Sequence, residues 1–94
     1  MKKSDVTFQQ LDLVLHTLNF KRKMGVNAFG IPHSGYVNTE YDAVILVPLG
    51  AADEFLLALD LHSVEKTIEN RGVLSRQAFA KLLNAITREQ KQAA

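Results

Sequence analysis

The N-terminal part of the chain has apolar residues at helical spacing. They occur at intervals of three and four residues, which places them on one face of a helix: Leu11, Val14, Leu15 and Leu18. Thr7 is a favourable N-cap residue, and Gln10 follows three residues later, as in a capping box. Asn19 is a suitable C-terminal stop. The pattern predicts a helix over about residues 8 to 18.

Between residues 20 and 48 the pattern changes to short extended segments. Gly25 and Gly30 interrupt the first of these, and Pro32 and Gly35 frame a predicted turn before Tyr36. Residues 43–47 are apolar on both faces and rich in branched side chains, which is typical of a well-covered strand. Together these segments predict a three-stranded antiparallel meander.

The C-terminal half of the sequence predicts a loop followed by two helices. Residues 49–55 have the composition of a loop, and a helix with Asp60 as its expected cap should end before Gly72. Ser75 can cap a second helix, whose apolar face contains Phe79, Leu82, Leu83 and Ile86. We expect frayed ends at about residues 1–5 and 88–94. The predicted architecture is a single α+β domain over residues 1–94, of order αβββαα, with the sheet packed against helices.

Composition narrows the classes of function. The 94 residues are 47% hydrophobic and 22% charged, with a formal net charge of +1 and no cysteine. The lack of cysteine excludes disulfides and thiolate metal sites. The sequence also has no apolar segment suited to export or membrane insertion, and the two observations together favour a cytoplasmic protein. A charge of +1 gives no general basic field for nucleic acid, although a local basic patch remains open.

His33 is the candidate reaction centre. It lies beside Pro32 and near Gly35 where a strand is expected to begin, and imidazole exchanges protons near neutral pH. His16 and His62 fall outside the apolar helix faces and are expected at the surface. The three histidines share no metal-ligand spacing with carboxylates, so neither a metal nor another cofactor is expected.

The order of these segments resembles the HicA-type toxins, which are RNA-cleaving partners of HicB-type antitoxins and have a fold similar to a double-stranded-RNA-binding domain. The likeness covers roughly residues 7 to 86. The elements that carry it are Pro32-His33, Tyr36, residues 39–42, Val44-Ile45-Leu46-Val47-Pro48, Asn70-Arg71-Gly72-Val73-Leu74, and Phe79 with Leu82-Leu83. Three or four extra residues between Phe20 and His33 depart from the family pattern.

The resemblance implies an endoribonuclease with His33 as its catalytic residue. An imidazole can take the proton of a ribose 2′-hydroxyl or protonate the leaving 5′-oxygen. The supporting RNA-binding residues are expected to be Lys21, Arg22, Lys23, Ser34 and Tyr36. The expected partners are therefore RNA and a HicB-like antitoxin, with no membrane.

Two features leave alternatives open. The inserted residues permit a second alignment in which Asn27 occupies the family histidine position, and the loop after Pro48 contains Asp53 and Glu54 where the family is rich in Arg and His. In the second alignment the active residue would be lost, and the near-neutral charge and the acidic, apolar loop favour a noncatalytic HicA-like module that binds RNA or protein. A third possibility is a DNA-binding module, because residues 72–77 resemble the turn of a helix-turn-helix.

Overall fold

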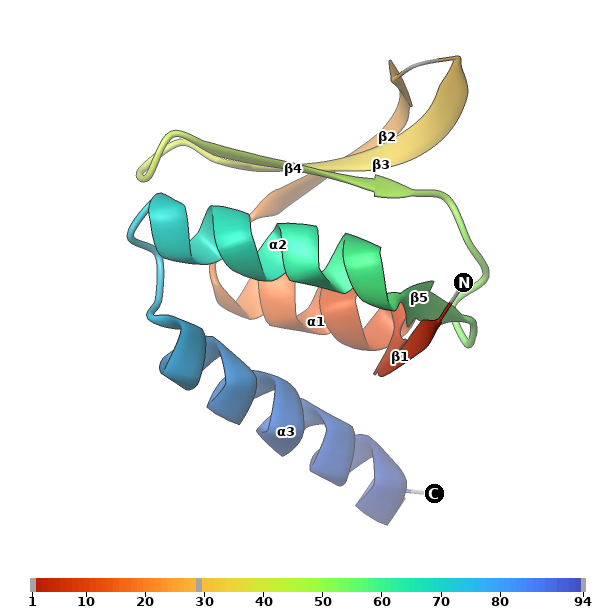
Figure 1. The fold of residues 1–94 in the computed structure, drawn as a ribbon, viewed down its shortest axis with the longest axis vertical. Coiled ribbons are helices and arrows are strands. Elements are labelled where there is room, and N and C mark those ends of the chain that lie inside the picture. The colour runs from red at the N-terminus through yellow and green to blue at the C-terminus, as the bar shows by residue number, and fades with distance from the viewer. Residues whose placement is uncertain (1, 29, 94) are drawn as a thin grey trace.

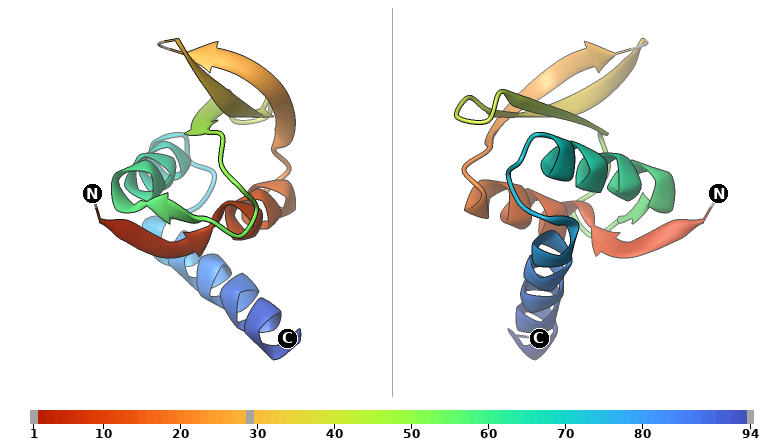
Figure 2. Two further views of the ribbon diagram at one scale, coloured as in Figure 1. Left: turned by 90° about the vertical axis from the view of Figure 1, so that its right-hand side faces the viewer. Right: turned by 60° about the vertical axis from the view of Figure 1, so that its left-hand side comes forward.

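A computed structural model describes residues 2–28 and 30–93 of the chain. The described residues form three helices and two antiparallel sheets in three layers (Figure 1). The larger sheet covers α1 (Phe8–Thr17) and α2 (Ala58–Asn70), and α3 (Arg76–Ala93) packs on those helices from the other side. Figure 2 shows that α3 and this sheet lie on opposite sides of α1 and α2. The predicted α+β class is confirmed.

The larger sheet is the predicted antiparallel meander. It contains β2 (Lys21–Ala28), β3 (Ile31–Asn38) and β4 (Ala43–Pro48), in the order β2-β3-β4. Its first two strands are longer than the sequence pattern predicted, and β2 has an irregularity between Lys23 and Val26. His33 consequently lies within β3, opposite Val26 and Pro48, and the expectation that it lies in a turn is wrong.

Two short strands were missing from the predicted order. β1 (Lys3–Thr7) and β5 (Phe55–Leu57) form a second antiparallel sheet, in which Lys3 pairs with Leu57 and Thr7 with Phe55. The observed order is therefore βαββββαα. β1 occupies most of the segment that was expected to fray at the N-terminus.

Helix α1 begins as its local sequence predicts. The backbone N–H of Gln10 donates to Thr7 Oγ1 at 3.2 Å, and the N–H of Thr7 donates to Gln10 Oε1 at 2.9 Å. These bonds satisfy two donors that a helix N-terminus otherwise leaves free. After the last turn, Asn19 adopts a positive φ of 67°, which ends the helix.

The ends of the two C-terminal helices agree only partly with the prediction. α2 begins at Ala58 after Leu57, which provides no side-chain cap, so the expectation of an Asp60 cap is wrong. Gly72 follows α2 with a φ of +74°, and Ser75 Oγ accepts a hydrogen bond from the N–H of Ala78 at 3.1 Å, both as predicted. In the part of the chain that is described, no helix has the length and apolar character needed to cross a bilayer.

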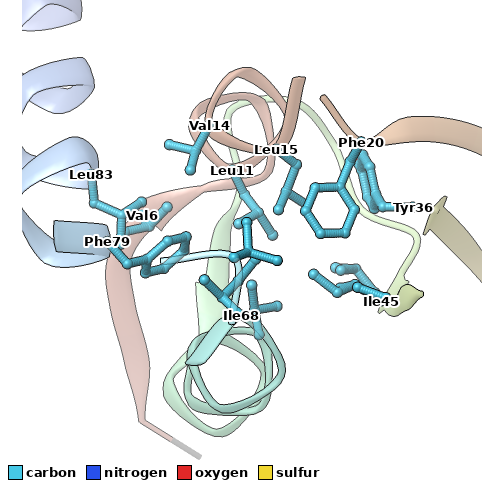
Figure 3. Close-up of a cluster of buried hydrophobic side chains, with 14 of the residues drawn as sticks. Val6, Leu11, Val14, Leu15, Phe20, Tyr36, Ile45, Ile68, Phe79 and Leu83 are labelled. Carbon is cyan, nitrogen blue, oxygen red and sulfur yellow. The ribbon is translucent and has the colours of Figure 1, made fainter. Parts of the chain in front are cut away.

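One apolar core joins all three layers (Figure 3). Leu11, Val14 and Leu15 of α1 are at most 1% exposed, in accordance with the predicted apolar face. The sheet contributes Tyr36 and Ile45, and α3 contributes Phe79. Because alternate residues of a strand point to opposite faces, burial of these residues fixes which face of the sheet points inward.

Candidate functional site

The predicted site residues divide between the two faces of the larger sheet. Arg22 pairs with Tyr36, and Tyr36 pairs with the buried Ile45. Because paired residues of neighbouring strands point to the same side, all three face the helices. Ser34 pairs with the buried Val47 and belongs to this inner face too.

The outer face carries the remaining predicted residues. Lys21 aligns with Val37 and Val44, Lys23 aligns with Gly35 and Leu46, and His33 aligns with Pro48. Val44 is 56% exposed and Leu46 45% exposed, and no described helix or strand covers them (Figures 1 and 2). The sheet therefore presents two lysines and a histidine around an exposed apolar strip.

His33 is oriented by a backbone contact at the start of β3. Its Nδ1 atom lies 2.7 Å from the carbonyl oxygen of Ile31. A carbonyl only accepts, so Nδ1 carries the hydrogen in the neutral ring and Nε2 has the free lone pair. This tautomer leaves Nε2 able to accept a proton from a bound ligand.

A polar network occupies the space between the inner face and α1. The Tyr36 hydroxyl donates to Asp12 Oδ1 at 2.8 Å, and Arg22 Nη1 lies 3.8 Å from the same oxygen. Arg22 Nη2 also donates to Ser34 Oγ at 3.2 Å, and His16 Nδ1 lies 3.3 Å from Asp12 Oδ2. Two predicted RNA-binding side chains, Arg22 and Tyr36, thus contact one carboxylate of α1, and Ser34 joins the network through Arg22.

Burial of the phenol raises the pKa of Tyr36, and the hydrogen bond and negative charge of Asp12 raise it further, while the charge of Arg22 opposes this. Tyr36 therefore stays protonated at neutral pH and serves Asp12 as a hydrogen-bond donor. Its hydroxyl is held inside the fold by this bond. It is not available at the outer face beside His33.

Asp12 is the residue that sequence reasoning missed. It lies next to the apolar positions of α1, and nothing in the local pattern connects it with β2 or β3. The one local signal was His16, four residues later, because residues at this spacing share a helix face. Its contacts with Arg22 and Tyr36 depend on the tertiary packing of α1 under the sheet.

A pocket of about 290 Å³ opens beside this network. Polar groups of Asp12, Arg22, Ser34 and Tyr36 line one part of it. The other lining residues come from α1, β4 and the following loop: Phe8, Gln9, Leu11, Val47, Gly50 and Ala52.

The loop after β4 is docked on the start of α1. The carbonyl oxygens of Ala52 and Glu54 accept hydrogen bonds of 3.0 Å from the N–H groups of Gln9 and Phe8. The acidic side chains of Asp53 and Glu54 are exposed, and Glu54 Oε1 lies 3.8 Å from Lys3 Nζ. This loop therefore offers carboxylates to solvent, where a phosphate-binding loop needs cations.

Two alternatives left open by the sequence, the Asn27 alignment and the DNA-binding module, concern different parts of the structure. Asn27 lies in β2 opposite Pro32, and its side chain is outside the part of the chain whose side chains are described. For the DNA-binding alternative, Arg76 of the segment that resembles a helix-turn-helix turn has its Nε 3.7 Å from Glu69 Oε2, so this cation is held in an internal ion pair.

Comparison with family models, curated proteins and solved structures gives no match to this chain.

Proposed function

We propose that this chain is a HicA-like domain that binds RNA on the outer face of β2-β3-β4 and cleaves it with His33. The observation that carries the proposal is the placement of His33, Lys21 and Lys23 on the same uncovered sheet face. The order α1-β2-β3-β4-β5-α2, with both helices under the same face of the larger sheet, supports a fold similar to a double-stranded-RNA-binding domain.

The chemistry follows from the state of His33. Its Nε2 atom accepts the proton of a ribose 2′-hydroxyl, and the resulting oxygen attacks the adjacent phosphorus. The 5′-oxygen then leaves with a proton from the imidazolium or from water. Lys21 and Lys23 stabilise the phosphate charge, because cations near the backbone supply most of the sequence-independent affinity for nucleic acid.

The roles of the other predicted residues change in this proposal. Arg22, Ser34 and Tyr36 belong to the inner face and take no part in holding the phosphate beside His33. Val44 and Leu46 add an apolar strip on which unpaired bases can lie. A HicB-like antitoxin is expected to cover this same face, and its binding should compete with RNA.

The test is RNA cleavage by the purified chain, with His33→Ala as the variant. His62→Ala is the matched control, since His62 is exposed on α2, which packs against the opposite face of the sheet from His33. We expect cleavage to disappear in His33→Ala and to persist in His62→Ala, with thermal melting showing that both variants fold. Equal cleavage by both variants would contradict the role of His33.

A noncatalytic RNA-binding module is the second candidate. Ser34 and Tyr36, the hydroxyl groups expected to help His33, lie on the other face of the sheet, so neither can transfer a proton beside His33. For this candidate the wild-type chain binds RNA in a gel-shift assay without cleaving it. His33→Ala then leaves the affinity nearly unchanged.

A further inference from the structure

The pocket beside Asp12 has the features of a small ligand site. Its volume of about 290 Å³ is at the lower end of the range for small-molecule sites, and its polar groups converge on one part of the lining. Tyr36 and Ser34 are only 4% and 5% exposed and form its interior, whereas the side chains of Asp12 and Arg22 are 27% and 37% exposed. A ligand can therefore reach both charged groups from solvent.

Asp12 and Arg22 give the pocket neighbouring acceptor and donor groups. The carboxylate has lone pairs beyond those used by Tyr36 and His16, and the guanidinium has N–H groups beyond the one given to Ser34. Arg22 Nη1 and Asp12 Oδ1 are 3.8 Å apart, so a ligand that spans them needs an acceptor directly beside a donor. Phe8 and Leu11 add apolar walls suited to a flat ring.

We infer that this pocket binds a guanine base. Along one edge guanine presents an acceptor, O6, next to two donors, N1–H and N2–H, so Arg22 can donate to O6 while Asp12 accepts from the two N–H groups. Adenine and cytosine each offer one amino donor on this edge, and uracil one imide donor. The small volume suits one base better than a whole nucleotide, whose phosphate would remain outside.

A guanine base has two sources, a nucleotide in RNA and a free guanine nucleotide. As a base-reading subsite of RNA, the inference rests on the proposed function. As a site for a free nucleotide, it is independent of that function. The pocket and His33 lie on different faces of the sheet, so the two can be tested separately.

The first experiment is an NMR titration of the ¹⁵N-labelled chain with GMP, AMP, CMP and UMP. The four nucleotides share a phosphate, so differences between them report the base. We expect GMP to bind at least about tenfold more tightly than the others and to shift signals of Phe8, Asp12 and Gly50. Equal affinity for the four, a preference for another base, or shifts confined to the outer sheet face would overturn the inference.

The decisive variant is Asp12→Asn, which keeps the shape of the side chain and replaces one acceptor by a donor. It should weaken GMP binding about tenfold and leave AMP binding unchanged, whereas the control Asp5→Asn removes an exposed carboxylate of β1 and should leave both unchanged. If thermal melting shows that Asp12→Asn is unfolded, Arg22→Lys provides the test, because it keeps the charge and removes the planar donor pair. Full GMP affinity in a folded variant would overturn the inference.

The source of the base is resolved with two RNA oligomers, a run of uridines with and without one central guanosine. Tighter binding of the guanosine-containing RNA, lost in Asp12→Asn, assigns the pocket to RNA. If the chain binds GMP but has equal affinity for the two oligomers, the pocket is assigned to a free nucleotide. Guanine binding that survives while RNA cleavage is absent contradicts the proposed function and leaves this inference standing.

Discussion

The Tyr36 hydroxyl donates a hydrogen bond of 2.8 Å to Asp12 Oδ1, and this bond joins the middle strand of the sheet to α1. Tyr36 is 4% exposed and belongs to the apolar core with Phe20 and Ile45 (Figure 3), while its hydroxyl oxygen reaches the carboxylate. The same carboxylate lies 3.8 Å from Arg22, which places the network at the wall of the inner-face pocket. One bond thus contributes both to the packing of α1 and to the position of Asp12.

Tyr36→Phe should destabilise the fold by about 1.5 kcal/mol at pH 7, the lower end for a hydrogen bond to a charged group, because Asp12 is partly solvated. The ring volume is unchanged, so the loss in the free energy of unfolding measures the contribution of the hydroxyl group. Thermal unfolding measures it, with an expected fall in Tm of about 6–12 °C for a domain of this size. Tyr41→Phe, at an exposed tyrosine in the β3–β4 turn, is the control and should change Tm little. Equal effects of the two substitutions would contradict the role given to the Tyr36–Asp12 bond.

The same residue predicts a loss of stability at alkaline pH. Burial and Asp12 raise the pKa of Tyr36 in the folded chain above its ordinary value of 10.0, so the folded state retains a proton that the unfolded state gives up. Its contribution is complete below pH 10 and falls as the pH rises above 10, by up to about 1.4 kcal/mol per pH unit. Urea unfolding from pH 8 to 11 should show this fall in the wild type and in Tyr41→Phe, and a shallower one in Tyr36→Phe. A parallel decline in all three would assign the alkaline loss to other groups.

The α1 capping box supplies a prediction for local helix stability. Thr7→Ala removes the acceptor for the Gln10 N–H and should cost about 1 kcal/mol. Thr39→Ala in the exposed β3–β4 turn is the matched control. Chemical unfolding of both variants measures the difference, and no difference between them would show that the cap adds nothing to stability.

This cap belongs to the part of the fold that local sequence determines. Thr7, Gln10, Gly72 and Ser75 act on residues within four positions of themselves, so their roles could be predicted without knowledge of the tertiary structure. β1 and β5 were missed for the opposite reason. The two strands pair residues about fifty positions apart, such as Lys3 with Leu57, and each is too short to show an alternating pattern.

The candidate site likewise combines features that local sequence predicts with features that depend on tertiary packing. Residues 21–23 form one basic run in the sequence, but a strand directs neighbouring side chains to opposite faces, so Arg22 separates from Lys21 and Lys23. That separation follows from strand periodicity and was predictable once β2 was assigned. The contacts of Arg22 and Tyr36 with Asp12 were not predictable, because they arise only where α1 packs under the sheet.

Gly50 predicts a coupling between the loop after β4 and α1. A Cβ atom at this position would overlap the ring of Phe8, which is partly buried against the core and lines the inner-face pocket. Gly50→Ala should therefore destabilise the fold by about 1–3 kcal/mol through overpacking. The matched background is Phe8→Leu, in which the same substitution should cost clearly less. Chemical unfolding of the wild type, the two single variants and the double variant gives the coupling free energy between Gly50 and Phe8. Additive effects of the two substitutions would contradict the contact.

The outer sheet face predicts how RNA affinity depends on salt. Each cation that neutralises a phosphate of single-stranded RNA contributes about 0.7 to the slope of log affinity against log salt concentration, because its binding releases counterions. Lys21→Gln with Lys23→Gln should therefore weaken binding and lower the slope by about 1.4, whereas Lys66→Gln with Lys81→Gln removes equal charge from exposed helical positions and should leave the slope unchanged. Fluorescence anisotropy with a labelled uridine oligomer over a series of salt concentrations measures both. Equal slopes for the two double variants would show that RNA does not bind through Lys21 and Lys23. An unchanged slope together with a preference for guanine would place the RNA contacts on the inner-face side of the sheet, beside Asp12.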